Sequence, residues 1–240
     1  MNHLEKQLKA LGLSLTEYQI SQFNMYRKMV IKKNEVMNLT AITDSAGFDL
    51  KHFADSLSLV SAAPDIRELL GTSVDVIDIG TGAGFPGIPL KIAFPEIRLT
   101  LLDSLNKRIS FLSEVTGALK LENVTLIHAR AEEGARKQEL RDHFDLAVSR
   151  AVANQSVLTE YCLPYVKKGG LFVAYKSGEV DEELREASHA IKVLGGTIEA
   201  HPYMNLPDSD ITRSFVVIRK LTATPKAYPR KPGTAKRDPL

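Results

Sequence analysis

Four glycines fall within eight positions in GTGAGFPG, the stretch from Gly80 to Gly87 that directly follows an apolar run. Glycines this dense let the backbone approach a bound molecule closely, because no Cβ stands in the way. Read from Gly82, the stretch matches G-x-G-x-x-G, the fingerprint of dinucleotide-binding proteins. The chemistry in question is therefore the binding of a ligand that contains a nucleoside.

The register of these glycines argues against a pyrophosphate. In a dinucleotide site the first glycine makes the turn directly behind the strand, and here that residue is Gly80. Counted from Gly80, Phe85 stands where the last glycine should be, and Pro86 removes a donor from the next helix N-terminus. No Gly-Lys-Ser/Thr follows, so a phosphate-binding P-loop also fails. An aromatic and a proline suit a less anionic ligand of the S-adenosylmethionine class, which carries no phosphate.

Acidic residues follow the next two apolar runs. Asp103 ends the run 98–103, 23 residues after Gly80, where a carboxylate can accept both ribose hydroxyls, although NAD enzymes share this feature. Glu132 follows the run 124–128, where it can accept the adenine amino group or simply complement a helix dipole. Because ligands bind at the carboxyl ends of parallel strands, the three strand ends together favour a ligand site.

Alternating strands and helices must position these residues. The apolar runs are rich in Val, Ile and Leu without polar alternation, which is typical of buried parallel strands. The expected strands are 74–79, 98–103, 124–128, 144–149, 171–175, 197–201 and 214–219, and the expected helices are 86–93, 106–120, 132–140, 153–166 and 181–194. The last two strands have no helix between them and predict a β-hairpin. The sequence therefore predicts an α/β fold with a doubly wound parallel sheet and an antiparallel edge strand.

The two ends of the chain differ from this central pattern. Apolar residues at helical spacing predict helices in the first 30 residues, with Ser14 or Thr16 as an N-cap, and Asp44 or Ser45 starts a further helix. We expect a helical cap over 1–70, a main domain over 71–221 and a tail over 222–240. Five basic residues and one acidic residue give the tail a net charge of +4, against +2 for the whole chain. Such a tail is typical of an arm that contacts a polyanion, or of a disordered end.

Composition limits the class of protein further. The hydrophobic content of 44% and the charged content of 25% are ordinary for a soluble globular protein. The N-terminus lacks a signal-peptide pattern, and no apolar run is long enough to span a membrane. Cys162 is the only cysteine, which excludes an internal disulfide and suits a reducing cytoplasm. The six histidines show no metal-ligand spacing, so we expect no metal, and we expect a cytoplasmic monomer.

Several motifs together resemble one known family. They are DIGTGAGFPGIPL, LLDSLNKRISFL, ARAEE, SRAVA and YPRKPGT, with MNLT and KHFADSL in the N-terminal cap. Over nearly its whole length the chain resembles the glucose-inhibited division protein B family, the 16S rRNA guanine-N7 methyltransferases. The resemblance implies a class I methyltransferase fold and methyl transfer from S-adenosylmethionine to one guanosine in the decoding region. Carried over by position, the cofactor contacts fall on Gly80, Phe85, Ala131, Glu132 and Arg150, to which the arguments above add Gly82 and Asp103.

The residues after the fourth strand bear on the methyl acceptor. Enzymes that methylate exocyclic base amines carry Asn/Asp-Pro-Pro-aromatic there, whereas this chain has SRAVA, and Cys162 lies in an expected helix where core packing is its role. A ring nitrogen such as guanine N7 already has an in-plane lone pair and needs alignment rather than a base. We therefore expect no catalytic acid or base. Arg150 is the candidate for positioning, through the methionyl carboxylate, guanine O6 or a phosphate, with a structural ion pair as the alternative.

The resemblance also favours contact between the basic tail and RNA, with cations neutralising phosphates and an aromatic ring stacking on a base. His52 and Asp55 lie on one predicted helical turn, where they either close over the site or pair locally. The expected RNA-binding residues are Arg150, Lys176, Lys226, Tyr228, Arg230 and Lys231. We expect that removing the tail weakens RNA binding and leaves cofactor affinity intact.

Three rival functions stay open on the residues alone. The first is a methyltransferase that acts on a small molecule or a protein, for which the basic tail is incidental. The second is an RNA-binding module that senses a nucleotide without catalysis. The third is a nicotinamide oxidoreductase, which Phe85 and Pro86 disfavour.

Overall fold

One mixed sheet organises the protein, and the computed structural model describes it over residues 3–150 and 153–240. Its strands are β1 (Asp75–Ile79), β2 (Arg98–Asp103), β3 (Val124–His128), β4 (Phe144–Ser149), β5 (Val166–Ser177), β6 (Gly196–Ala200), β7 (Tyr203–Asn205) and β8 (Thr212–Lys220). The strand order is β3-β2-β1-β4-β5-β8-β6, and β7 pairs with β8. Strands β1 to β5 pair in parallel, as predicted.

Antiparallel pairings complete the sheet beyond β5. Strands β6 and β8 pair antiparallel, which confirms the predicted hairpin. However, β8 also pairs antiparallel with β5, so the strand that runs against the others lies inside the sheet and β6 forms the edge. The expected antiparallel edge is thus the pairing of β6 with β8. The sequence did not predict that β8 is the strand that joins the parallel part, because adjacency in the chain does not say which of two hairpin strands does so.

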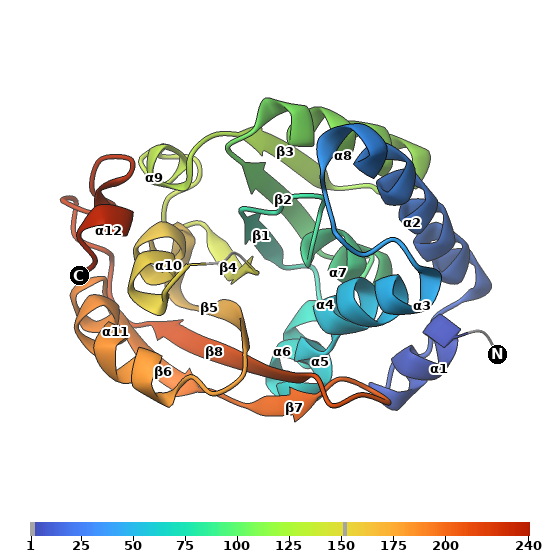
Figure 1. Cartoon of the computed structure of the whole chain (residues 1–240). Helices are drawn as coiled ribbons and strands as arrows, with labels where there is room; N and C mark the ends of the chain where they lie inside the picture. The colour runs from blue at the N-terminus through green and yellow to red at the C-terminus, as the bar shows by residue number, and fades with distance from the viewer. Residues whose placement is uncertain (1–2, 151–152) are drawn as a thin grey trace.

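Helices cover both faces of the sheet (Figure 1). They are α1 (His3–Ala10), α2 (Glu17–Met37), α3 (Ser45–Phe48), the π-helix η1 (Asp49–Ala54), α4 (Asp55–Leu57), α5 (Leu59–Ala62), α6 (Pro64–Leu70), α7 (Gly87–Ala93), α8 (Asn106–Ala118), α9 (Ala131–Gly134), α10 (Gln155–Cys162), the 3-10 helix η2 (Leu163–Tyr165), α11 (Asp181–Val193) and α12 (Thr234–Arg237). The helix expected over 132–140 is thus a single turn. The helix expected over 153–166 ends at Cys162, because Pro164 cannot donate to the preceding turn.

Capping residues set the predicted starts of two N-terminal helices. Thr16 Oγ1 accepts the Gln19 N–H at 3.2 Å while the Gln19 side chain accepts the Thr16 N–H at 2.9 Å, a capping box that starts α2. Asp44 accepts the Gly47 N–H at 2.7 Å and starts α3. The helical N-terminal segment is therefore confirmed, with its helix starts where side chains satisfy free N–H groups.

Two hydrophobic clusters lie on the two faces of the sheet, because side chains alternate along each strand. Val76 and Leu101 pack toward α2, whose Phe23 and Tyr26 are fully buried in the same cluster. Ile77 and the residues alternating with it pack toward α10 and α11 in the second cluster. The helical segment 3–70 thus shares one core with the sheet, which places it directly against the glycine turn.

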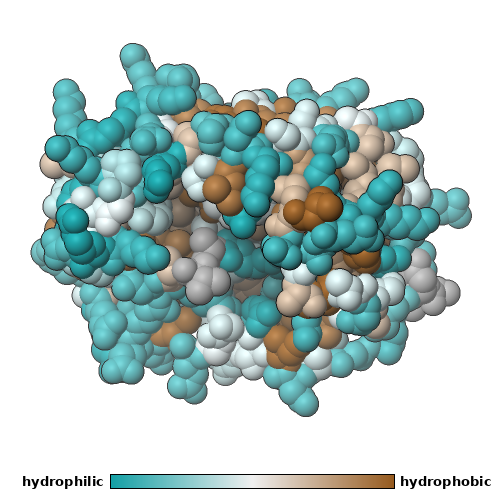
Figure 2. Space-filling view, turned by 45° about the horizontal axis from the view of Figure 1, so that its top comes forward, coloured by the Kyte–Doolittle hydropathy of each residue, from teal (hydrophilic) through white to brown (hydrophobic). Residues whose placement is uncertain are grey.

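The face shown in Figure 2 is mostly hydrophilic, with small separate hydrophobic patches and a hollow near its centre. No helix in the described part of the chain is long and apolar enough to cross a membrane.

Candidate active site

A hydroxyl from the N-terminal segment holds the glycine turn. Tyr26 Oη donates to the Ala83 carbonyl at 2.6 Å. Gly80, Gly82 and Gly84 have φ values of 74°, 62° and 107°, which residues other than glycine rarely adopt. A Cβ on Gly84 would lie 2.6 Å from the same Tyr26 hydroxyl, so this glycine is needed for packing as well as for its backbone angle.

Asp78 supports the same turn from beneath. Its Oδ2 accepts the Thr81 hydroxyl at 2.6 Å and the Gly87 N–H at 2.9 Å, while Oδ1 has no hydrogen-bond partner among the described residues. Complete burial raises the pKa of Asp78 to about 6. Sequence reasoning missed this residue, although a carboxylate in an apolar strand two positions before Gly80 was a usable signal.

A cavity of about 350 Å³ lies at the carboxyl ends of β1, β2, β3 and β4, within the range of small-molecule sites. Gly80, Asp103, Ala131 and Glu132 line it, and these are four of the seven residues expected to bind the cofactor. The apolar part of its lining includes Ile79, Leu102, Ala129 and Leu158. Three segments far apart in the sequence therefore meet where the strand-end argument predicts.

Asp103 joins the second strand to the glycine turn. Its Oδ2 accepts the Gly82 N–H at 2.9 Å, its Oδ1 accepts the Leu105 N–H at 2.9 Å, and Arg108 lies 3.1 Å from Oδ2. A carboxylate oxygen accepts more than one hydrogen bond, so capacity remains for ribose hydroxyls. With apolar residues for an adenine and this carboxylate for a ribose, the lining fits S-adenosylmethionine, which supplies a methyl group on a sulfonium when bound. Gly82 acts here through Asp103, and it does not line the cavity.

Phe85 and Arg150 lie outside this cavity. Phe85 is 7% exposed, and its ring stacks on His52 with centroids 4.6 Å apart. The Arg150 guanidinium lies over the same ring, 5.1 Å from its centroid. Their assignment to the cofactor stays a prediction, because neither residue lines this cavity.

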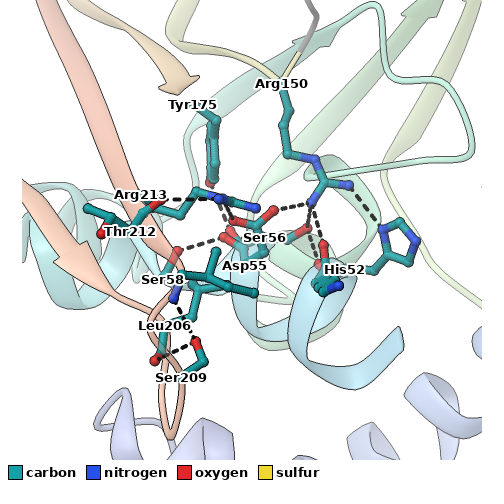
Figure 3. A network of polar contacts seen from close by, with 12 residues as sticks. His52, Asp55, Ser56, Ser58, Arg150, Tyr175, Leu206, Ser209, Thr212 and Arg213 are labelled. Carbon is teal, nitrogen blue, oxygen red and sulfur yellow. Dashed lines mark hydrogen bonds and ion pairs between the residues drawn. The ribbon is translucent and has the colours of Figure 1, made fainter. Parts of the chain in front are cut away.

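Arg150 faces a second cavity of about 890 Å³, while the residue before it, Ser149, lines the first. In the second cavity Asp55 Oδ2 lies 2.8 Å from Arg150 Nη1, and Asp55 Oδ1 lies 2.6 Å from Arg213 Nε (Figure 3). The Asp55 side chain is buried between the two guanidinium groups. Its role is therefore an ion pair across distant elements rather than a local cap, and Arg213 is a residue that sequence reasoning missed, without any signal that marked it.

His52 lies beside this ion-pair network. Its Nε2 lies 2.7 Å from Thr40 Oγ1, and Arg150 Nη2 lies 3.5 Å from its Nδ1. Burial, together with the neighbouring Arg150 charge, lowers the pKa of His52 to about 3. The imidazole is therefore neutral at physiological pH.

Lys176 also lines the second cavity. Its ammonium lies 2.7 Å from Glu183 and donates to the Ala153 carbonyl at 2.8 Å. Together four cations and two carboxylates line this cavity: Lys51, Arg150, Lys176, Arg213, Asp55 and Glu183. The excess of cations over carboxylates suits an anionic ligand. Residues 151 and 152 of the SRAVA motif lie outside the described residues.

The C-terminal tail packs on the domain. The Arg141 guanidinium donates to the Thr224 and Tyr228 carbonyls, at 2.7 and 3.0 Å. The Arg230 guanidinium donates to both oxygens of the buried Glu160 carboxylate, so it is engaged inside the protein instead of lying free for RNA. Tyr228 is half-buried against the core. Of the four predicted RNA contacts in the tail, Lys226 and Lys231 are the exposed ones.

Cys162 is fully buried, and burial raises the pKa of its thiol, which favours a packing role over nucleophilic catalysis. Within residues 3–150 and 153–240, no group of three or more His, Cys, Asp or Glu residues is arranged to hold a metal ion.

The sheet order and the strand-end cavity define the class of the protein. Its fold is that of the class I S-adenosylmethionine-dependent methyltransferases. Similar folds include M. jannaschii TYW2 in complex with AdoMet, with a TM-score of 0.51, 14% identity and coverage of 67% of this chain and 77% of that chain. A putative sarcosine dimethylglycine methyltransferase from Galdieria sulphuraria has a TM-score of 0.51, 13% identity and coverage of 69% and 87%.

The particular family follows from sequence similarity. The GidB family model, described as rRNA small subunit methyltransferase G, matches residues 19–212, and the chain belongs to this family. A ribosomal RNA small subunit methyltransferase G of Lachnoclostridium phytofermentans is 50% identical over 97% of this chain and 94% of its own length. Another, from Clostridium botulinum, is 45% identical over 100% of this chain and 98% of its own length.

Proposed function

We propose that this protein transfers the methyl group of S-adenosylmethionine to N7 of one guanosine in 16S rRNA. Its relatives are named ribosomal RNA small subunit methyltransferases, which supports the RNA substrate. The observation that carries the proposal is the placement of Ser149 and Arg150, consecutive residues that line a cofactor cavity and a cation-lined cavity. We further propose that the protein acts as a cytoplasmic monomer on the RNA or on a small-subunit precursor.

The proposed reaction needs alignment rather than proton transfer. The N7 lone pair attacks the methyl carbon, the carbon–sulfur bond breaks, and its electron pair stays on sulfur as a neutral thioether. N7 takes up the positive charge and loses no proton, so no general base is required. The neutral His52 and the ion-paired Asp55 are then positioning groups, and the rate enhancement comes from proximity and orientation.

Arg150 is the residue best placed to orient the acceptor. Asp55 and the Phe85 ring fix its guanidinium, which leaves further N–H donors of the group for a ligand. O6 and N7 lie on the same edge of guanine, so a donor that binds O6 also sets the direction of N7. The cation-lined cavity would hold the flanking phosphates.

Labelled S-adenosylmethionine and unmethylated 16S rRNA test the proposal, with the RNA supplied both free and as a small-subunit particle. We expect label at a single guanosine, recovered as N7-methylguanosine after digestion, and mapping then gives its position. Label in protein or in a small metabolite would instead favour the first rival function. Binding of the cofactor without transfer to any RNA would favour a module without catalysis.

A further inference from the structure

The last residues of the chain fold back onto the cofactor side of the domain. Figure 1 shows α12 beside α9 and α10. Arg230 anchors this return, because its backbone N–H and its guanidinium both bind the Glu160 carboxylate, which is 1% exposed. Arg136 and Arg141 add hydrogen bonds to the carbonyls of Pro229 and Tyr228. The return is thus fixed by partly buried, charge-assisted hydrogen bonds.

This segment reaches the cofactor cavity itself. Gly233 and Lys236 line the same cavity as Gly80 and Asp103, although more than a hundred residues separate them in the chain. Ala235, between the two, is 1% exposed, so the short helix packs firmly on the domain. The tail therefore forms part of the cavity wall beside the residues that follow β3.

One contact links the tail to a predicted cofactor residue. The Gly233 N–H donates to Glu132 Oε1 at 2.9 Å, and the Glu132 side chain is buried. Tyr161 lines the same cavity as Glu132, and burial together with the Glu132 charge raises the pKa of Tyr161. The Gly233 N–H therefore holds the carboxylate from the side of the tail.

We propose that residues 229–237 are part of the cofactor site, and that the Gly233 N–H positions Glu132 to accept the adenine 6-amino group. The proposal rests on the cofactor half of the proposed function and is independent of the RNA half. It reverses the expectation that loss of the tail leaves cofactor affinity intact. Gly233 is a positioning residue, while Lys236 forms the outer wall of the cavity.

Binding measurements without RNA test the proposal. The ligands are S-adenosylhomocysteine and S-inosylhomocysteine, which differ at purine position 6, where the first alone carries an amino group. We expect the full chain to prefer the adenine ligand by about tenfold, the scale of one hydrogen bond to a charged group. A chain ending at Lys231 should bind both ligands more weakly and lose most of that preference. Weaker binding with an unchanged preference would reduce the tail to a structural support and overturn the positioning role.

Point variants keep the test decisive if the shortened chain unfolds. Arg230→Gln removes the ion pair with Glu160 and should reduce the preference for the adenine ligand as the shortened chain does. Unchanged binding of both ligands would contradict the proposal. Lys236→Ala should weaken both ligands, whereas Arg237→Ala, its exposed neighbour in α12 that does not line the cavity, is the matched control. Equal affinities of these two variants would refute the role of Lys236 as the outer wall of the cofactor cavity. If the protein meets these expectations but methylates no RNA, only the proposed RNA substrate is contradicted, and the proposal for the cofactor site stands.

Discussion

Arg150 and Asp55 lie 95 residues apart in the chain and form an ion pair with Nη1 and Oδ2 separated by 2.8 Å. The pair joins the residue that follows β4 to a helical turn of the N-terminal segment. Arg213 on β8 binds the other oxygen of the same carboxylate, so one buried aspartate connects three elements around the second cavity.

Replacing Asp55 tests this connection. In Asp55→Asn the two guanidinium groups keep their charge without the carboxylate, and breaking a buried pair from one side costs about 3 kcal/mol of stability. Urea unfolding measures that loss. Asp65→Asn, at an exposed position of α6, is the control and should change little. If Asp55→Asn unfolds like the control, the network contributes nothing to the fold.

Gly84 and Gly82 form a matched pair in the cofactor turn. Gly82→Ala places a methyl group in open space at a φ of +62° and should cost about 1 kcal/mol through backbone strain alone. Gly84→Ala adds contacts of 2.6 Å with Tyr26 and 2.7 Å with Ile88, and overpacking adds about 1 to 3 kcal/mol. Thermal unfolding of the two variants checks the order, which equal losses would disprove.

The pKa of His52 predicts a loss of stability in acid. The native pKa of about 3 lies below the ordinary value of 6.5, so the unfolded chain binds the proton first as pH falls. The contribution of the neutral imidazole to the free energy of unfolding is complete above pH 6.5 and is lost toward pH 3, by up to about 5 kcal/mol. The difference between wild type and His52→Gln should therefore shrink from pH 7 to pH 4.5 in urea unfolding. Parallel curves would contradict the assignment.

The titration of Asp78 changes the stability with pH in the opposite direction. Its native pKa of about 6 lies above the ordinary 3.8, so the native state binds the proton more tightly and stability falls as pH rises through this window. Asp78→Asn lacks that titration and should gain on the wild type by up to about 3 kcal/mol between pH 4 and pH 6. Unfolding curves at several pH values measure the gain. A constant difference would mean that Asp78 stays ionised.

The exposed tail lysines are expected to contact RNA phosphates. Lys226→Ala with Lys231→Ala should weaken RNA binding and lower the slope of log affinity against log salt by about 1.5. Lys9→Ala, an exposed cation of α1, serves as the control. Filter binding across a salt series gives the slope, and an unchanged slope would remove the tail lysines from the RNA interface.

The local pattern of the sequence determined the parallel strands, the helix starts and the strand-end residues. Apolar runs of strand length, the capping residue Thr16 and the carboxylate Asp103 each depend on neighbours within a few positions. Because parallel strands bring their carboxyl ends together, the sequence alone predicts that Gly80, Asp103 and Glu132 share one site, and all three line one cavity.

Only the tertiary structure decided which distant groups pair. The sequence could not choose Arg213 as the second partner of Asp55, or place β8 inside the sheet. The sequence assigned the cations of the tail to RNA because of their charge. In the structure the tail cation Arg230 binds Glu160, and the backbone N–H of Gly233 in the same tail binds Glu132. Charge is a property of one residue, but its partner is set by how the remaining chain packs, since a buried charge must be neutralised by whatever group the fold brings within reach.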